Sequence, residues 1–235
     1  MKDNAVEKRS APPDSAKPAA DTGAINLGWL GSRLRTERER LEISLRELAR
    51  RINVSPSLIS QIERGLAMPS VSTLWSLATE LGLTIDELFS ASERSAAAPG
   101  GAGKDSEAGA ARSPVQRRLG RKRIRLAGGV LWERLTAQSD EEVEFLHVVY
   151  EPGAESCPPD SLFRHGGKEY AYLLSGRLGL QIGFESYELE AGDSVSFSAA
   201  MPHRLWTIGN EPAVAVWVVI NRTHDVRATG GDLPA

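Results

Sequence analysis

The sequence predicts two domains of different fold class, an all-α domain of five helices followed by an all-β barrel, and three observations support this. Apolar residues recur at helical spacing between residues 27 and 90. Short apolar alternations broken by glycine turns fill residues 117–227. The intervening residues 91–116 are rich in Gly, Ala and Ser, which predicts a flexible linker. We expect residues 1–26 to be a disordered tail and residues 228–235 a short C-terminal tail.

Bulk composition narrows the classes of protein. The 235 residues are 41% hydrophobic, which suffices for real cores. The longest apolar run, Ala213–Ile220, is less than half as long as a membrane span needs, and the N-terminus lacks the apolar stretch of a signal peptide. The single cysteine, Cys157, excludes an internal disulfide and suits a reducing compartment. We therefore expect a cytoplasmic protein, with Cys157 as a packing residue rather than a ligand or a reactive thiol.

Charge is divided unevenly along the chain, although the net charge is only −3. Residues 28–64 hold eight Arg against five Glu, and Arg112–Arg125 holds seven basic residues and no acidic one. From Leu126 onward there are seven basic and sixteen acidic residues. Because the N-terminal part of the chain is basic and the C-terminal part is acidic, we expect a polyanionic partner for the N-terminal part only.

The five predicted helices have recognisable ends. The helices are expected at about residues 28–41, 45–52, 56–64, 74–81 and 84–89. Their start signals are the capping boxes Ser44 with Glu47 and Thr84 with Glu87, and Ser55 before Pro56; their stop signals are Gly65 and Gly82. In the second domain, apolar alternation within residues 178–182, 195–197 and 214–220 predicts short antiparallel strands of a sandwich or barrel.

The third predicted helix has an apolar and a polar face. Its polar residues fall at positions i, i+3, i+4 and i+7 and form one stripe: Ser57, Ser60, Gln61 and Arg64. A short helix with such a stripe fits the major groove of DNA, where Gln can pair with adenine and Arg reaches guanine or phosphate. The alternative is that the stripe is only a solvent-exposed face.

The stretch LRELARRINVSPSLISQIERGLAMPSVSTLWSLATELGLTIDELF closely resembles the phage-repressor-like, or XRE-type, helix-turn-helix over about residues 28–90. The resemblance implies that residues 44–52 cross the DNA backbone while residues 56–64 enter the major groove. Arg38 and Glu63 match a pair that links helix 1 to the recognition helix in relatives. The DNA-binding residues implied are Ser44, Arg46, Ser55, Pro56, Ser57, Ser60, Gln61 and Arg64. Among these, Pro56 stands where family members often have a polar side chain, so its contact can only be apolar.

Two further stretches, RHGGKEYAYLLSGRLGLQIG and LEAGDSVSFSAAMPHRLW, resemble the two motifs of the cupin barrel over about residues 140–210. Cupins often hold a metal with three His and one Glu, and here Phe163 stands in place of the first His. The resemblance leaves His165, Glu169 and His203, a two-His-one-carboxylate set that suits Fe, Zn or Mn.

Geometry sets a condition on this set, because residues four apart on a straight strand lie about 13 Å from one another. Gly166 and Gly167 must therefore fold the chain back. Three roles stay open: metal binding, metal-free binding of an organic effector, or no role. Inward alternation would add an effector-pocket lining of Phe163, Ala171, Leu173, Leu205 and Thr207. That lining favours a small, partly apolar effector with one polar or anionic group.

Together the resemblances imply a bacterial transcription regulator with a five-helix helix-turn-helix domain and a cupin (double-stranded β-helix) sensor domain. It is expected to bind double-stranded operator DNA as a homodimer or higher homo-oligomer and to respond to a small-molecule effector. One alternative is a mononuclear non-haem iron oxygenase or epoxidase with an accessory helix-turn-helix domain. Another is a DNA-binding protein whose barrel only dimerises. The basic run Arg112–Arg125 either contacts DNA phosphates or, as we favour, begins the barrel.

Overall fold

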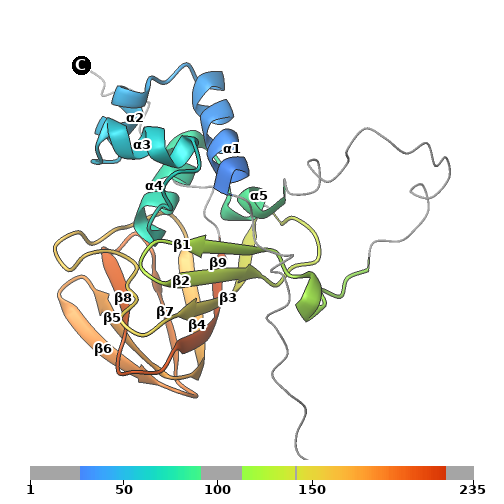
Figure 1. Ribbon diagram of the computed structural model, residues 1–235. Helices are drawn as coiled ribbons and strands as arrows, with labels where there is room; N and C mark the ends of the chain where they lie inside the picture. The colour runs from blue at the N-terminus through green and yellow to red at the C-terminus, as the bar shows by residue number, and fades with distance from the viewer. Residues whose placement is uncertain (1–26, 91–112, 141, 221–235) are drawn as a thin grey trace, which may run out of the picture.

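The computed structural model describes residues 27–90, 113–140 and 142–220, and these form a helical domain seated on a β domain (Figure 1). The helices are α1 (Leu27–Arg40), α2 (Leu45–Arg51), α3 (Pro56–Glu63), α4 (Val71–Leu81) and α5 (Ile85–Ser90). The strands are β1 (Arg123–Leu126), β2 (Val130–Arg134), β3 (Val143–Tyr150), β4 (Lys168–Ser175), β5 (Arg177–Ile182), β6 (Glu185–Glu190), β7 (Ser194–Ser198), β8 (His203–Thr207) and β9 (Ala213–Ile220). Both predicted tails and nearly all of the predicted linker lie outside the described residues.

The predicted helix ends are confirmed except for two differences: α4 begins at Val71, capped by Ser70, instead of near Leu74, and one capping box is incomplete. Thr84 and Glu87 form a reciprocal capping box, in which each backbone N–H donates to the other's side chain. The Ser44 hydroxyl accepts from the backbone N–H of Glu47 at 3.1 Å, but the carboxylate of Glu47 binds Arg50 and Arg51 instead of returning to Ser44. Only half of the first capping box therefore forms.

Helix α3 is held against α1 by a buried ion pair. Arg38 donates to both carboxylate oxygens of Glu63, at 2.6 and 2.9 Å, and to the carbonyl of Ile43 at 2.9 Å. Both charged side chains are at least 90% buried. The helices also approach closely at Gly31, where a Cβ atom would lie only 2.3 Å from the carbonyl oxygen of Ile62. The pair that the family resemblance implied is thus present, and it positions α3.

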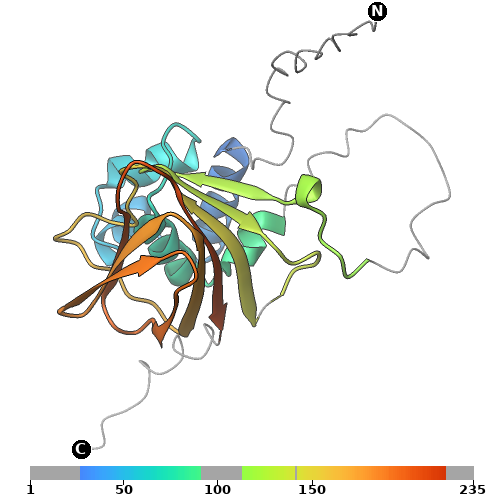
Figure 2. The same cartoon turned by 90° about the horizontal axis from the view of Figure 1, so that it is seen from below.

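The β domain consists of two antiparallel sheets that face one another (Figure 2). The larger sheet has the strand order β1-β2-β3-β9-β4-β7, and the smaller has the order β6-β5-β8. Backbone bridges join Phe163 to His203 and Glu155 to Trp206. The arrangement is that of a cupin sandwich, and the buried apolar side chains of both sheets fill the space between them.

Strand β9 is apolar on both faces, so its sequence alone does not say which face is buried. The structure buries Ala213, Ala215, Trp217 and Val219. The alternating Val214, Val216, Val218 and Ile220, which predicted the strand, lie half-buried on the outer face of the larger sheet.

The C-terminal end of the basic run Arg112–Arg125 forms β1, as favoured from the sequence. Ile124 is buried and Arg125 points to solvent. Arg121 and Arg123 bind the carboxylate of Glu133, at 3.1 and 2.7 Å. Two charges of this segment are therefore paired within the β domain.

Helices α4 and α5 pack directly against the β domain (Figure 1). The carboxylate of Asp86 accepts hydrogen bonds from the Arg134 side chain and the Asp140 backbone, at 3.3 and 3.2 Å, and Glu144 accepts from the Ile85 backbone at 3.0 Å. The two domains thus share a buried interface in addition to the chain segment that joins them. No helix in the described part of the chain has the length and apolar character of a membrane span.

We expect Arg38→Ala to lower the free energy of unfolding by about 3 kcal/mol, because it leaves the buried Glu63 carboxylate without a partner. The matched change Arg35→Ala removes an exposed pair with Glu39 and should cost less than about 1 kcal/mol. The double variant Arg38→Met/Glu63→Leu should recover most of the loss. Urea unfolding of the three variants measures this, and equal effects of Arg38→Ala and Arg35→Ala would contradict it.

Candidate functional site

The polar stripe of α3 lies on the surface of the helical domain. Ser55 caps the helix by accepting from the Leu58 N–H at 3.1 Å, and Pro56 follows at the first turn. Ser57, Gln61 and Arg64 are exposed, whereas Ser60 is half-buried. Ser57 and Gln61 make no side-chain hydrogen bond to any described residue, so their polar groups face solvent. Such side chains are available to pair with base edges.

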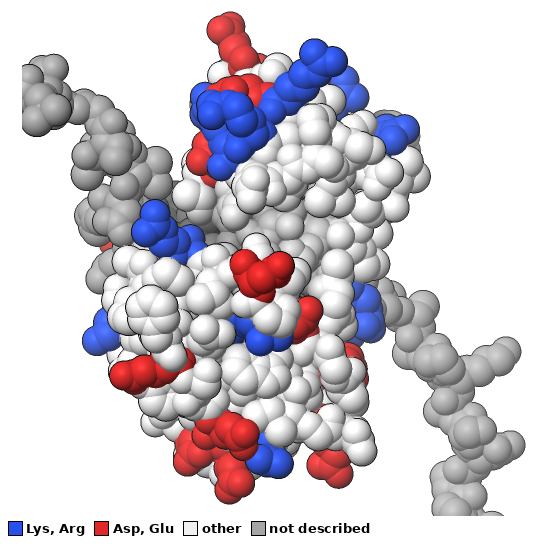
Figure 3. Space-filling view, turned by 90° about the vertical axis from the view of Figure 1, so that its left-hand side faces the viewer, with Lys and Arg blue, Asp and Glu red and all other residues white. Residues whose placement is uncertain are grey.

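Helix α2 adds further exposed groups beside this stripe. Ser44, its N-cap, and Arg46 are exposed, and Arg46 has no ion-pair partner among the residues that the structure describes. Figure 3 shows Lys and Arg side chains gathered over the helical end of the molecule and Asp and Glu side chains more numerous at the far end of the β domain. The sequence-level charge asymmetry is thus an asymmetry between the two ends of the molecule.

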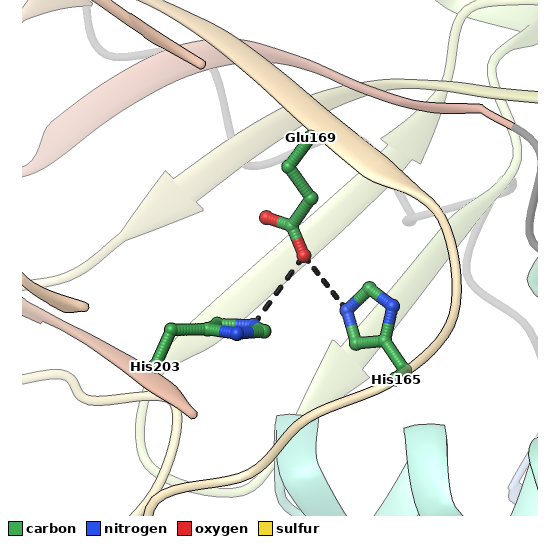
Figure 4. A group of neighbouring side chains, drawn as sticks. All are labelled: His165, Glu169 and His203. Carbon is green, nitrogen blue, oxygen red and sulfur yellow. Dashed lines mark ion pairs between the residues drawn. The ribbon is translucent and has the colours of Figure 1, made fainter. Parts of the chain in front are cut away.

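In the β domain, His165, Glu169 and His203 point toward one another (Figure 4). His165 precedes β4, Glu169 lies within β4, and His203 begins β8. The Nε2 atoms of His165 and His203 lie 2.7 and 3.4 Å from Oε1 of Glu169, and all three residues are buried. Gly167 makes this possible, because its positive φ of 99° turns the chain between His165 and β4.

The protonation of both imidazoles at Nδ1 follows from their hydrogen bonds. Nδ1 of His165 lies 2.9 Å from the carbonyl oxygen of Gly166, and Nδ1 of His203 lies 2.9 Å from that of Met201. A carbonyl oxygen only accepts, so each Nδ1 carries a proton. Neither Nε2 makes a well-oriented hydrogen bond to a described atom, although both are buried.

The Glu169 carboxylate is kept ionised by its neighbours. Burial by itself raises the pKa of this carboxyl, but the contacts with His165 and His203 outweigh burial and lower the pKa to about 2. Its other oxygen, Oε2, accepts a hydrogen bond of 2.8 Å from the Trp217 indole. The carboxylate is therefore charged, buried and fixed in direction.

The donor set fits a divalent cation. Two buried Nε2 atoms and a carboxylate oxygen lie within 4.8 Å of one another, and the Nδ1 bonds to backbone carbonyls are the arrangement usual for metal-binding His. A cation between these atoms, either a bound metal or a proton on each imidazole, removes the repulsion between nitrogen lone pairs and the carboxylate. Phe163 occupies the position where cupins often have another His, and its ring centroid lies 4.4 Å from that of His203.

A small cavity of about 30 Å³ adjoins Glu169. Of the predicted lining, Phe163 and Leu205 face this cavity, whereas Ala171, Leu173 and Thr207 are buried without lining it. Glu169 is the one charged group among the described residues of the wall; the other lining residues are Val71, Trp75, Trp132, Leu146, Val148, Tyr150 and Trp217.

The residues that sequence reasoning missed are mostly aromatic. Trp75 lies in a segment predicted as a helix with an apolar core face, and Trp217 lies in a segment predicted as a strand. The apolar character of both segments was thus already explained, and neither tryptophan was assigned to the site. A usable signal was present in each case. Trp75 extends the apolar face of α4 beyond Leu74, Leu77, Ala78 and Leu81, and Trp217 is the only aromatic side chain in an aliphatic strand.

Cys157 is only 1% exposed, and burial raises the pKa of its thiol. A buried thiol of raised pKa is a poor nucleophile and a poor metal ligand. The structure therefore supports the packing role expected for Cys157.

Comparison with known proteins agrees with both domains. A helix-turn-helix family model matches residues 34–88, and a cupin domain model matches residues 135–219. The chain is 25% identical to the HTH-type transcriptional regulator PuuR of Escherichia coli (strain K12) over 173 residues, 74% of this chain and 84% of PuuR. It is 39% identical to an uncharacterized transcriptional regulator in the ATPase CF(0) region of Rhodospirillum rubrum; the match spans 79 residues, 33% of this chain and 73% of that protein.

A solved structure supports the arrangement of the fold. The crystal structure of an HTH_3 family transcriptional regulator from Vibrio cholerae superposes with a TM-score of 0.58 at 20% identity. The match covers 83% of this chain and 97% of that chain. The chain thus belongs to the XRE-type helix-turn-helix transcriptional regulators, and it carries a C-terminal cupin domain.

Proposed function

We propose that this DNA-binding regulator acts in the cytoplasm as a homodimer on operator DNA, and that a small-molecule effector bound in the cupin domain changes its affinity for the operator. The observation that carries the proposal is the direct packing of α4 and α5 on the β domain, beside the buried triad His165, Glu169 and His203. A sensor site in this position is linked to the DNA-binding domain by direct side-chain contacts, in addition to the chain segment that joins the two domains. Coupling of about 1–3 kcal/mol would change operator affinity 5- to 150-fold.

We assign base contacts to the exposed stripe of α3 and backbone contacts to its surroundings. Gln61 and Ser57 have free hydrogen-bonding groups for base edges, and Arg64 reaches a base or a phosphate. Ser44, Arg46, Ser55 and Ser60 lie beside them and are assigned to the DNA backbone or to the rim of the groove. Pro56 can add only an apolar contact.

We expect Gln61→Ala to weaken binding to the protein's own upstream DNA by about 1–3 kcal/mol, because one base contact is lost. Arg121→Gln/Lys122→Gln is the matched control, since Arg121 is bound to Glu133 in the β domain. The control should leave the slope of log affinity against log salt unchanged, whereas a lost phosphate contact would reduce it by about one. Electrophoretic mobility shift at several salt concentrations measures both. An unchanged affinity for Gln61→Ala would contradict the assignment.

We propose that His165 Nε2, His203 Nε2 and a Glu169 oxygen hold a divalent metal, Fe, Zn or Mn. When bound, the metal would supply open coordination positions for a polar or anionic group of the effector. The chain's own residues would do the rest: Trp217 orients Glu169, Gly166 and Met201 orient the imidazoles, and the apolar wall excludes water. The alternative is a metal-free site in which His165, Glu169 and His203 form a polar cluster that holds an organic effector directly.

Protein purified without chelator or affinity metal should contain about one metal ion per chain by elemental analysis. His203→Ala should reduce this below about a tenth, and His147→Ala, which removes a His outside the cavity, should not change it. Phe163→His, which returns a nitrogen ligand to the place where cupins often have one, should tighten the metal. A wild-type content below about a tenth would overturn the metal assignment and leave the metal-free site.

The enzymatic alternative, an oxygenase or epoxidase, requires a substrate beside the same triad. We propose a sensing role instead, because the cavity of about 30 Å³ is closed by the DNA-binding domain. Anaerobic loading with Fe(II), followed by oxygen-uptake measurements with candidate substrates, distinguishes the two. Substrate-dependent oxygen consumption would overturn the sensing role.

We propose that the dimer forms through the outer face of the larger sheet. Tyr170, Tyr172 and Leu174 of β4 are 38%, 49% and 45% exposed. Tyr170 and Tyr172 line a shallow groove with Val195, Val216 and Val218, which contains no charged residue. An exposed apolar face of this kind is typical of an interaction surface, and operator half-sites about 34 Å apart require two reading heads.

We expect Tyr172→Glu to convert the dimer to a monomer, because it places a charge in the apolar groove. Light scattering after size exclusion measures the mass. Tyr187→Glu, on the exposed β6 strand, is the matched control and should stay dimeric. A monomeric wild type, or a dimeric Tyr172→Glu, would contradict this surface.

A further inference from the structure

The cavity beside Glu169 is roofed by the DNA-binding domain. Val71 and Trp75 of α4 line it together with side chains of the β domain. The Trp75 indole stacks flat on the His165 imidazole, with ring centroids 4.1 Å apart and an interplanar angle of 2°. It also meets the Trp132 ring edge-on at 5.9 Å, and only 5% of Trp75 is exposed. One side chain of the helical, DNA-binding domain (the reading domain) therefore covers the cavity of the cupin domain (the sensor domain).

Hydrogen bonds hold α4 in this position. The Ser72 N–H donates to the Ser156 carbonyl at 3.2 Å, and the Ala127 N–H donates to the Pro69 carbonyl at 2.9 Å. Both bonds lie at the start of α4, close to Trp75 along the chain. Farther on, the contacts of Asp86 and Glu144 hold α5. The indole is thus one part of a docked surface rather than a loose flap.

The remaining space is too small for an organic effector. A cavity of about 30 Å³ holds one or two water molecules, whereas pockets for small molecules usually measure about 300 Å³ or more. Trp75 is the larger of the two lining side chains that the helical domain contributes, and its withdrawal would make room. The surface that it would uncover includes the flat face of His165 and the edge contact with Trp132, in a cavity that Phe163 also lines.

Movement of Trp75 would displace the recognition helix as well. Helix α1 packs against both α4 and α3, which ties these two helices together within the helical domain. Because a packed core moves as a unit, α4 cannot leave the barrel without changing where α3 lies.

We propose that Trp75 is an internal plug of the effector site, and that an effector with a planar, mostly apolar ring takes its place against His165. Binding of that effector and docking of α4 on the barrel then exclude one another. Effector binding releases the reading domain and changes the placement of the two recognition helices in the dimer. This inference rests on the proposed function, since it places the effector in the cupin cavity.

Trp75→Gly in the full chain tests the plug, with free indole as the probe. The substitution opens a cavity of the shape of the probe, so calorimetry should detect one indole bound per chain. Wild type should bind at least tenfold more weakly, because its tethered indole competes at high effective concentration. Trp206→Ala is the matched control, since its half-buried ring lies over Arg204 on the surface and its loss opens no enclosed space.

The distance between the domains gives a second readout. Spin labels at Ser57→Cys and Glu188→Cys, both exposed, in a Cys157→Ala background report the separation of α3 from β6. We expect a narrow distance distribution in wild type and in Trp206→Ala, a broad one in Trp75→Gly, and a narrow one again when indole is added to Trp75→Gly. If Trp75→Gly does not fold, Trp75→Leu replaces it in both measurements, because leucine keeps an apolar side chain at this position. Trp75→Leu should also bind indole more tightly than wild type.

Equal indole binding by wild type and Trp75→Gly, or an unchanged distance distribution in Trp75→Gly, would overturn the plug. Retention of upstream DNA is measured on the corresponding unlabelled chains, which keep Ser57. A Trp75→Gly chain that retains DNA but binds no indole overturns the plug alone. A wild type that retains no upstream DNA overturns the proposed function, whatever the indole result.

Discussion

The buried carboxylate of Glu169 is the constraint on which the arrangement of the cupin domain depends. An ionised group at this depth is costly unless it is paired, and three side chains meet it: His165, His203 and Trp217. They come from the turn before β4, from β8 and from β9, so one carboxylate joins the larger sheet to the smaller one. His165 in turn carries the Trp75 indole of the reading domain on its face. The polar centre of the barrel is therefore in contact with the domain boundary.

A second buried carboxylate has a similar role at the edge of that boundary. Asp86 of α5 receives hydrogen bonds from Arg134, the last residue of β2, and from Thr136 and Asp140 in the segment that joins β2 to β3. Buried ionic groups add little net stability in general, because desolvation offsets their attraction. They do penalise misplacement, since a shifted helix would leave a charge without partners. Asp86 and Glu144 thus specify where α5 sits, while the stacking of Trp75 specifies how deeply α4 enters the barrel.

This contact changes how the two domains can communicate. The flexible linker that the sequence predicts at residues 91–116 would by itself transmit orientation poorly, and on that basis an effector would act through dimerisation. Direct packing offers a shorter route, because the side chain that closes the sensor cavity belongs to a helix whose other face is in the core of the reading domain. Coupling then needs only two arrangements of one interface, docked and undocked, with different affinities for the effector.

The sequence by itself determined the local structure. Helix ends depend on caps and glycines within a few residues, so Ser55, Gly65 and the Thr84–Glu87 box were predictable, and the resemblance to the cupin motifs implied the triad. Tertiary structure decided what depends on distant partners. Glu47 binds arginines instead of completing its box, and β9 turns Trp217 inward although both of its faces are apolar. The flat contact between Trp75 and His165 joins residues 90 positions apart in different domains. No local pattern encodes such a contact, because it exists only when both domains have folded and packed against one another.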